Sequence, residues 1–342
     1  MKTNFEKISI ETIDKNVNIK INDNIEIPQT LYKYYVLSHF AVESLENSTV
    51  HFGHSYRMND LMDGNFLLWD FDGFLDTYMH EMQLPMQQKE NYRHYLLNEI
   101  SKDFLQYIGY FCLCETHKND LLWTHYTNEK GYCIEFDTQL LLNSFKAHQS
   151  YFFPINYGEL KRIDFEKHII KTQTNGKRIS VDANIPLFYT LANKEGFWNY
   201  EKEWRLIIRD KNFSPVSRPE NIISAEKSKK EKEDLKSRNL QVSRESINKI
   251  ILSTLFFNNE RFDHFETINN EVVQLTFLED KFKKDLIKFL TILREEFGDK
   301  IFQVNKYLKE GMVIRDITYK VEILEITEKH VQIRKMPYPN VY

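Results

Sequence analysis

The sequence predicts an α+β protein in which strands and helices follow one another irregularly, unlike the regular βαβ series of a doubly wound fold. Runs rich in β-branched and aromatic residues, typical of buried strands, alternate with segments whose apolar residues recur three and four positions apart, as in amphipathic helices. Polar clusters fall at strand ends or beside aromatic turns, and no internal repeat indicates a solenoid or propeller. The 342 residues, at ~150 per domain, allow one large or two unequal domains.

The first third of the chain predicts a β extension followed by mixed elements. Isoleucine alternates with polar residues over 1–30, which favours short strands. The following segment, beginning L-Y-K-Y, predicts a short strand, then a helix over about 37–47 and a strand over 49–54, and R-M-N-D-L-M-D-G predicts a loop. Helical spacing over 66–107, broken at Pro85, indicates a helical insertion.

The remaining two thirds add strands and a C-terminal extension. Further strands are predicted at Y-I-G-Y-F-C-L-C-E-T, G-Y-C-I-E-F-D-T-Q-L, W-R-L-I-I-R and N-K-I-I-L-S-T-L-F-F. The charged stretch 225–240 predicts a solvated or partly disordered connection rather than a nucleic-acid contact, because acidic residues interrupt its lysines. Residues 259–297 are expected to be helical, and T-Y-K-V-E-I-L-E-I-T-E-K-H-V-Q-I-R-K predicts a terminal hairpin. We therefore expect a main domain over 31–257 and an extension of helix and hairpin over 258–342.

Composition excludes several classes of enzyme. The charge balance of 46 basic and 50 acidic residues, net −4, gives no global reason to expect a nucleic-acid or membrane-surface partner. Only 10 glycines are present, and they form no G-x-G-x-x-G, G-x-x-x-x-G-K-[ST] or G-x-S-x-G motif. Those motifs need glycine where the backbone turns tightly or approaches a phosphate, so Rossmann, P-loop and nucleophile-elbow sites lose their physical basis.

The cysteines and the apolar segments predict a cytoplasmic protein without a membrane partner. Cys112, Cys114 and Cys133 are an odd and sparse set, and the N-terminus lacks the apolar run of a signal peptide. No stretch approaches the ~18 apolar residues of a membrane-spanning helix. A zinc site at Cys112, Cys114, His117 and His125 is disfavoured because C-x-C in a buried strand is not the usual C-x-x-C knuckle, so no metal is expected.

Four clusters combine aromatic rings with hydrogen-bonding or ionisable groups, the composition of a site that stacks a flat ring and orients a polar reaction. They are Leu31-Tyr32-Lys33-Tyr34, Met58-Asn59-Asp60, Leu122-Trp123-Thr124-His125-Tyr126 and Trp198-Asn199-Tyr200-Glu201-Lys202-Glu203-Trp204-Arg205.

Each cluster also has a purely structural interpretation. On a strand Glu201, Glu203 and Arg205 share one face, which suits either a catalytic carboxylate oriented by its neighbours or an ion-pair row. His125 could polarise a substrate or be a satisfied core histidine, and Asn59-Asp60 is equally typical of a turn.

The order and spacing of these motifs resemble a bacterial family. L-Y-K-Y at 31–34, N-D at 59–60, L-L-W-T-H-Y at 121–126, G-Y-C-I-E-F-D at 131–137 and K-E-G-F-W-N-Y-E-K-E-W-R at 194–205 together resemble the uncharacterised-domain family numbered twenty-nine seventy-one, over about 31–257. The family name confers no activity.

The same ordered set is similar, more distantly, to the DNA ADP-ribosyltransferase toxins, which begin with a strand that contacts NAD and place a catalytic glutamate at a strand start. This similarity implies an ADP-ribosyltransferase-like fold, a split or strongly bent mixed β-sheet with flanking helices. It implies Glu203 as the catalytic carboxylate, with Glu201 and Arg205 orienting it. Tyr32 and Lys33 would contact NAD, Asn59 and Asp60 would lie over the nicotinamide ribose, and Trp123, His125 and Tyr126 would line the pocket.

The expected function is therefore a bacterial toxin or antiphage-defence enzyme that consumes NAD as substrate, either transferring ADP-ribose to a nucleic-acid or protein acceptor or hydrolysing NAD. One alternative is a module that binds a nucleotide or partner without turnover. Another is a metal-dependent nuclease using Glu135, Asp137, Glu201 and Glu203.

Overall fold

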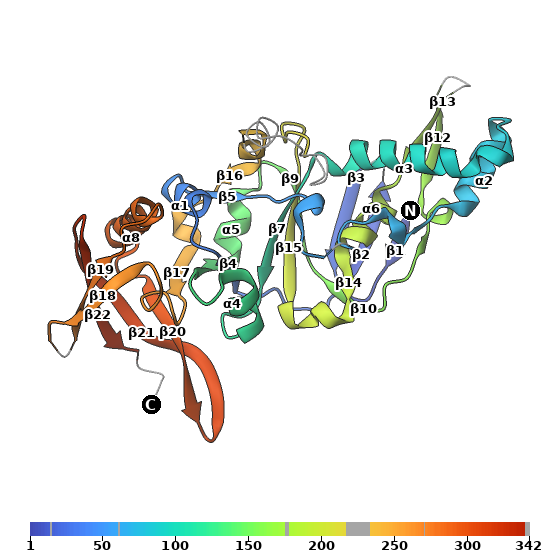
Figure 1. Cartoon of the computed structure of the whole chain (residues 1–342). Helices are drawn as coiled ribbons and strands as arrows, with labels where there is room; N and C mark the ends of the chain where they lie inside the picture. Colours follow the sequence, from blue (N-terminus) through green and yellow to red (C-terminus); the bar gives the residue numbers. More distant parts are fainter. Residues whose placement is uncertain (14–15, 61, 175–177, 217–232, 270, 339–342) are drawn as a thin grey trace. The chain divides into compact units, whose positions relative to one another are not determined.

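The computed structural model describes residues 1–13, 16–60, 62–174, 178–216, 233–269 and 271–338 (Figure 1). The chain forms two compact units. Unit 1 comprises Met1–Ile27, His51–Cys112 and Ala147–Asn239, and unit 2 comprises Pro28–Val50, Leu113–Lys146 and Leu240–Tyr342. Both units contain helices and sheets, so the α+β class is confirmed.

In its described residues, unit 1 combines small sheets with the helices α2, α3 and α6. Its N-terminal strands form an antiparallel sheet in the order β1-β2-β3, which confirms the predicted short strands. Strands β7, β15 and β9 are hydrogen-bonded neighbours, and β15 runs antiparallel to β9. The helices and strands of unit 1, including those at its boundaries, are β1 (Lys2–Asn4), β2 (Ile8–Ile13), β3 (Asn16–Ile21), β5 (Thr49–His51), β6 (Trp69–Asp70), α2 (Asp72–Glu81), α3 (Lys89–Leu105), β7 (Ile108–Cys114), β9 (Gln149–Pro154), β10 (Asn156–Gly158), β11 (Ile163–Asp164), β12 (Ile170–Thr174), β13 (Arg178–Asp182), α6 (Asn184–Ala192), β14 (Asn193–Glu195), β15 (Glu203–Arg209) and β16 (Asn239–Gln241).

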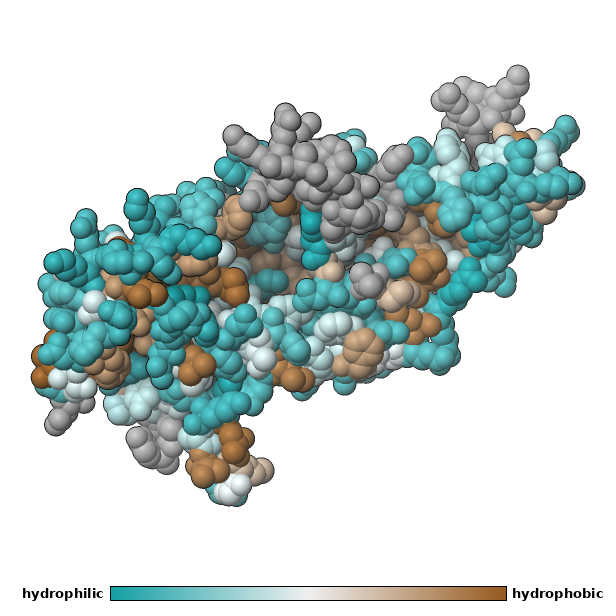
Figure 2. All heavy atoms as spheres, viewed as in Figure 1, coloured by the Kyte–Doolittle hydropathy of each residue, from teal (hydrophilic) through white to brown (hydrophobic). Residues whose placement is uncertain are grey.

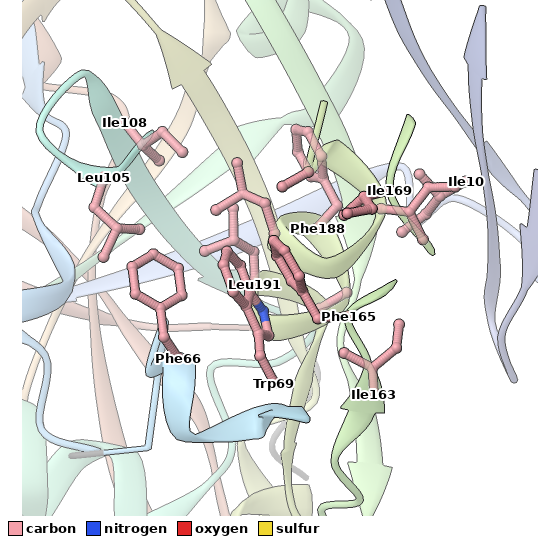
Figure 3. Packing of buried hydrophobic residues seen from close by; sticks show 14 of the residues in the cluster. Ile10, Phe66, Trp69, Leu105, Ile108, Ile163, Phe165, Ile169, Phe188 and Leu191 are labelled. Atoms are coloured by element: carbon pink, nitrogen blue, oxygen red, sulfur yellow. The ribbon is translucent and has the colours of Figure 1, made fainter. Parts of the chain in front are cut away.

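The core of unit 1 is built on aromatic contacts around Trp69 (Figure 3). The Trp69 ring lies 4.2 Å from Phe66 and 4.8 Å from Phe165 between ring centroids. Its indole nitrogen donates to the Pro186 carbonyl and to Thr190 Oγ1, so this buried side chain leaves no polar atom unsatisfied. These bonds hold helix α6 in the core.

Unit 2 is a large mixed sheet covered by helices. The strand order is β18-β19-β22-β21-β20-β17-β8-β4, in which β17 and β20 are parallel and the pairs on either side are antiparallel. Helix α8 buries one apolar face. The centroid of its Phe289 ring lies 4.8 Å from the centroid of the Tyr132 ring on β8. The helices and strands of unit 2 are β4 (Thr30–Tyr35), α1 (His39–Glu46), α4 (Asp120–Thr127), β8 (Tyr132–Asp137), α5 (Thr138–Ser144), β17 (Ile247–Leu252), β18 (Phe262–Thr267), β19 (Val272–Phe277), α8 (Lys283–Phe297), β20 (Ile301–Lys309), β21 (Met312–Ile326) and β22 (His330–Pro337).

In unit 2 one sequence-based expectation is wrong, one is confirmed, and one helix was not predicted. The segment 259–297 is helical only in its second half, because F-D-H-F-E-T and V-V-Q-L-T-F form the strands β18 and β19. The terminal hairpin is confirmed as β21 and β22. Helix α4 lies where no element was predicted, and it begins at an Asn119 cap that accepts from the Leu121 amide.

Residues 225–232 of the charged stretch 225–240 lie outside the described residues, and residues 233–240 are described. Its described end differs from the predicted solvated connection, because Arg238 is fully buried and donates to the carbonyls of Ile108 and Gln106. Its Nη1 and Nη2 donate to backbone acceptors, whereas its Nε has no hydrogen-bond partner among the described residues.

The surface carries both polar and apolar regions. Apolar side chains gather at the tip of the β20–β21 hairpin (Figure 2), where Leu308, Met312 and Val313 are exposed. Among the described residues no helix has both the length and the apolar character needed to cross a membrane.

Candidate functional site

Five charged side chains of unit 1, which we call the charged cluster, lie together in the interior with at most 6% of each residue exposed. They are Asp63, Lys194, Glu201, Glu203 and Arg205. Ionised side chains are rarely buried unless they are paired, so this density of charge is the most unusual chemical feature of the unit.

Arg205 joins two of the carboxylates. Its Nη1 and Nη2 donate to the two oxygens of Asp63 at 2.7 and 2.5 Å, a bidentate pair. Its Nε donates to Glu203 Oε1 at 2.7 Å, and Nη1 also donates to the Leu191 carbonyl at 2.7 Å. The guanidinium therefore fixes Glu203 against helix α6 and the core below it.

Lys194 links Glu201, the third carboxylate of the cluster, to Glu203. Its Nζ donates to Glu203 Oε2 at 2.6 Å and to Glu201 Oε2 at 2.9 Å, and lies 3.8 Å from Asp63 Oδ2. The ammonium also lies 5.5 Å from the ring centroid of Trp198, within the range of a cation–π contact. Lys194 and Arg205 thus hold Glu203 from both of its oxygens.

Local backbone structure explains how the E-x-E sequence reaches this geometry. Glu203 is the first residue of β15, as predicted, and its amide donates to Tyr157 Oη at 2.8 Å. Glu201 belongs to the 3₁₀ helix Gly196–Glu201, and Lys202 takes a left-handed conformation with φ of 42°. The prediction that Glu201 and Glu203 share a strand face is therefore wrong, because a turn rather than strand alternation brings their side chains together.

Asp63 reaches the cluster through the predicted R-M-N-D-L-M-D-G loop. Asp60 shapes the loop, since its Oδ1 accepts from the Met62 amide and its carbonyl accepts from the Asp63 amide. Gly64 follows with φ of 68°, where an added Cβ would lie 2.9 Å from both Ser55 Cβ and Tyr110 Oη. Only glycine fits here without displacing the loop that carries Asp63.

The cluster carries surplus negative charge. Three carboxylates against two cations leave a net charge of −1 when all five groups are ionised. Burial opposes ionisation of Glu203, yet the adjacent charges of Arg205 and Lys194 outweigh it and hold its pKa well below the usual range. Burial raises the pKa of Asp63. Asp63 is therefore the carboxyl group that takes up a proton more easily than Glu203 does, and Glu203 remains an anion.

Several buried polar atoms of the described residues have no hydrogen-bond partner there, and two of them belong to residues near the cluster in the chain. They are the acceptor Asp60 Oδ2 and the donor Trp198 Nε1. Unsatisfied buried groups are uncommon and need an explanation.

The predicted site residues on β4, Tyr32 and Lys33, belong to unit 2. Tyr32 donates from Oη to Glu135 Oε2 at 2.9 Å, and Lys249 Nζ donates to both oxygens of Glu135. Lys33 is half-buried and, as the neighbouring residue of β4, projects from the opposite face to Tyr32. One ligand on one face of this strand can contact only one of the two side chains.

The predicted site residues on α4 differ in their burial. Trp123 is fully buried, and its indole donates to the His117 carbonyl at 2.6 Å. His125 is exposed and Tyr126 is half-buried. Asn59, in unit 1, is exposed, whereas its neighbour Asp60 is buried. Of the predicted site residues, the structure brings together Glu201, Glu203 and Arg205.

Sequence reasoning missed two members of the cluster. Asp63 lies in the loop where Asn59 and Asp60 were chosen, and Lys194 opens the K-E-G-F-W-N-Y-E-K-E-W-R motif without having been assigned a role. The charges of the E-K-E-W-R sequence could have indicated Lys194. If Glu201 and Glu203 are both buried, Arg205 alone cannot balance them, and a further cation is needed.

Metal ligation has little support in the described part of the chain. There, no group of three or more histidine, cysteine, aspartate or glutamate residues is arranged to hold a metal ion. Cys112, Cys114 and Cys133 are free thiols. Cys114 Sγ lies 3.4 Å from the Tyr32 carbonyl, and His117 Nε2 lies 2.9 Å from Asp316 Oδ1, so these two residues have other partners.

Comparison with known proteins gives one match. The sequence model of a family described as "Protein of unknown function (DUF2971)" matches residues 122–206. This range contains Lys194, Glu201, Glu203 and Arg205, and it supports the resemblance to an uncharacterised family. Neither the curated proteins nor the solved structures gave a match.

Proposed function

We propose that the charged cluster is the catalytic centre of an NAD-consuming enzyme with an ADP-ribosyltransferase-like fold, which transfers ADP-ribose to a macromolecule or to water. The observation that carries the proposal is the state of Glu203, a carboxylate at the start of β15 that Arg205 and Lys194 keep ionised in a low-dielectric interior. An anion of this kind is what cleavage of an N-glycosidic bond requires.

The chemistry follows from charge. Loss of nicotinamide from NAD leaves an oxocarbenium-like ribose, and a fixed carboxylate stabilises the positive charge that develops there. The net charge of −1 in the cluster strengthens this effect, because the developing cation would neutralise it. Arg205 and Lys194 fix the orientation of Glu203 before substrate binds, so little reorganisation is needed during the reaction.

The unsatisfied atoms suit the same substrate. A nicotinamide carboxamide or a ribose hydroxyl has the acceptor that Trp198 Nε1 lacks and the donor that Asp60 Oδ2 lacks. The aromatic side chains of the 3₁₀ helix, with Phe197 64% exposed, offer stacking area for a flat ring. A toxin or defence role, with a nucleic-acid or protein acceptor, is the biological context that we propose for such an activity.

The test is NAD turnover by matched variants. NAD labelled on nicotinamide in one sample and on the adenylate in another is incubated with the full chain and with DNA, RNA or protein acceptors. We expect nicotinamide release by the wild type, a loss of about 10²–10³-fold in Glu203→Gln, which keeps the side-chain shape, and little change in Glu195→Gln, a control outside the cluster. No release with any acceptor, or full activity in a folded Glu203→Gln variant, would refute the proposal.

One observation favours a second function, a module that binds a nucleotide without consuming it. Both oxygens of Glu203 already accept hydrogen bonds from Lys194 and Arg205, as in a structural ion pair. Thermal unfolding with NAD, ADP-ribose and ATP separates the two functions, since a ligand at 100 times its Kd adds about 2.7 kcal/mol of stability. Stabilisation by a nucleotide that is recovered intact indicates a binding module.

The metal-dependent nuclease has no such support. Both oxygens of Glu135 accept from Lys249, and Asp137 Oδ1 accepts from the Leu140 amide as the cap of α5. Magnesium-dependent cleavage of DNA or RNA would be the result that restores it.

A further inference from the structure

Strand β18 ends the sheet of unit 2, and β19 is its one hydrogen-bonded neighbour among the described strands. Every residue from Asp263 to Thr267 is exposed. A free strand edge presents unpaired backbone groups, and proteins often guard such an edge with lysine or proline. The sequence of β18, F-D-H-F-E-T, contains neither. Its register shift against β19 lies between Phe262 and His264, so residues 264–267 form a regular edge that is open to pairing.

The backbone groups that face this free edge belong to Phe265 and Thr267. The Ile268 amide donates to the Val272 carbonyl, so these two residues are a hydrogen-bonded pair of the antiparallel β18–β19 ladder. Hydrogen-bonded and non-hydrogen-bonded pairs alternate along such a ladder. Glu266 therefore bonds toward β19, whereas Phe265 and Thr267 point their N–H and C=O groups away from it.

An apolar row that crosses the sheet ends uncovered at Phe265. Leu275 of β19 lies opposite Phe265, and Val331 of β22 lies opposite Leu275. Leu275 and Val331 are 1% and 0% exposed, whereas Phe265 is 57% exposed. Residues opposite each other on neighbouring strands share a face of the sheet. An apolar side chain on an added strand would therefore continue the row and remove the Phe265 ring from water.

We propose that β18 pairs with β18 of a second copy of this chain, antiparallel and about a two-fold axis at Phe265. In this register Phe265 lies opposite the partner's Phe265, and the two residues exchange both of their outward backbone hydrogen bonds. His264 lies opposite the partner's Glu266, and Glu266 lies opposite the partner's His264. Each imidazole then has a carboxylate acceptor beside it.

The sequence of β18 favours this register over its neighbours. Moving the axis by one residue sets Glu266 against the partner's Glu266 in one direction and His264 against the partner's His264 in the other. Like charges directly opposite each other are destabilising, so neither shift offers the same match. The strand is thus complementary to a second copy of itself, as a two-fold interface must be.

The first test is sedimentation velocity of the full chain from about 1 to about 500 µM, because association follows mass action. Two paired edge strands form a small interface, and interfaces below about 1,200 Å² are usually weak. We therefore expect the average mass to rise toward that of a dimer with concentration. We also expect the backbone amides of β18 to exchange hydrogen more slowly at the higher concentrations.

The second test is a charge exchange on β18. His264→Glu sets two carboxylates opposite each other, and Glu266→Lys sets an ammonium opposite an imidazole, so each change should raise the Kd of the dimer several-fold. The double variant His264→Glu with Glu266→Lys places an ion pair at both positions and should return the Kd to near that of the wild type. The control is Phe40→Ser, which removes a ring that is 53% exposed on α1 and should leave the Kd unchanged.

A wild type that stays monomeric over the whole range would overturn the proposal and leave this edge to an extended segment of another protein. A dimer that neither single variant weakens, or that the double variant does not restore, would overturn the pairing of His264 with the partner's Glu266.

Discussion

Replacing Arg205 with methionine isolates the contribution of the charged cluster to stability. Methionine retains much of the apolar stem of arginine but removes every donor of the guanidinium. The change deletes the bidentate pair with Asp63, the bonds to Glu203 and the bond to the Leu191 carbonyl. It leaves three carboxylates in an interior where Lys194 is the one remaining cation of the cluster.

The expected size of the effect follows from this imbalance. Removing one partner of a buried ion pair destabilises a protein by about 3–5 kcal/mol, because the other charge remains buried without compensation. Here Arg205 is fully buried and Asp63 and Glu203 are each 4% exposed, so we expect the upper part of this range. A loss of that size is a large fraction of the ~5–15 kcal/mol that stabilises a typical domain.

The assay is urea unfolding, followed by the fluorescence of the 4 tryptophans, which include Trp204, 1% exposed on the same strand. The matched control is Arg209→Met, since Arg209 is a partly buried β15 residue whose Nη1 donates to the neutral Asn184 amide oxygen. We expect the control to lose less than about 2 kcal/mol. Adding Asp63→Asn to Arg205→Met should recover part of the loss, with a coupling energy of about 0.5–3 kcal/mol.

Two results would contradict this reasoning. One is a loss in Arg205→Met no larger than that in Arg209→Met. The other is strict additivity of Asp63→Asn and Arg205→Met, which would mean that the two side chains do not depend on each other for charge compensation.

Two further predictions concern the neighbourhood of the cluster within unit 1. His54 is 2% exposed, and burial lowers its pKa from 6.5 to about 3, so the folded state excludes a proton that the unfolded state binds between these pH values. The contribution of the neutral His54 to the free energy of unfolding is therefore complete above about pH 6.5, and about 2 kcal/mol of it is lost at pH 5. The variant His54→Asn should show a flatter profile of unfolding free energy against pH. Parallel profiles for the variant and the wild type would argue against a neutral buried imidazole. Gly64→Ala should destabilise by about 1–3 kcal/mol because φ is 68° and the space is filled, whereas Gly158→Ala, which meets nothing within 4 Å, should be nearly neutral in the same urea titration. Equal midpoints for the two alanine variants would contradict that explanation.

The local elements followed largely from sequence because local chemistry specifies them. Isoleucine alternation predicted β2 and β3, and the run W-R-L-I-I-R predicted β15, which has Glu203 at its start. The main helical miss, 262–277, shows the limit of periodicity: F-D-H-F-E-T carries no clean pattern, and pairing with β22 through backbone bonds decides that the segment is strand.

Membership of the charged cluster depends on contacts that lie far apart in sequence. Arg205 and Asp63 are 142 positions apart, and no local pattern distinguishes Asp63 from Asp60 in one short loop. The left-handed conformation at Lys202 was equally hidden, since lysine has no preference for it. Tertiary packing of unit 1 decides both, which is why the sequence identified Glu203 and Arg205 but not the full cluster.

The charge count of the cluster separates its two interpretations. A network selected for stability alone is best when acids and bases balance, because each surplus buried charge adds desolvation without a partner. Asp63, Glu201 and Glu203 exceed Lys194 and Arg205 by one negative charge. An energetic cost of that kind is typical of a site that stabilises positive charge during a reaction, and it is recovered when a cationic transition state forms. Glu203→Gln therefore distinguishes the two: in a purely structural network it matters only to stability, whereas in a catalytic one a folded variant loses nicotinamide release.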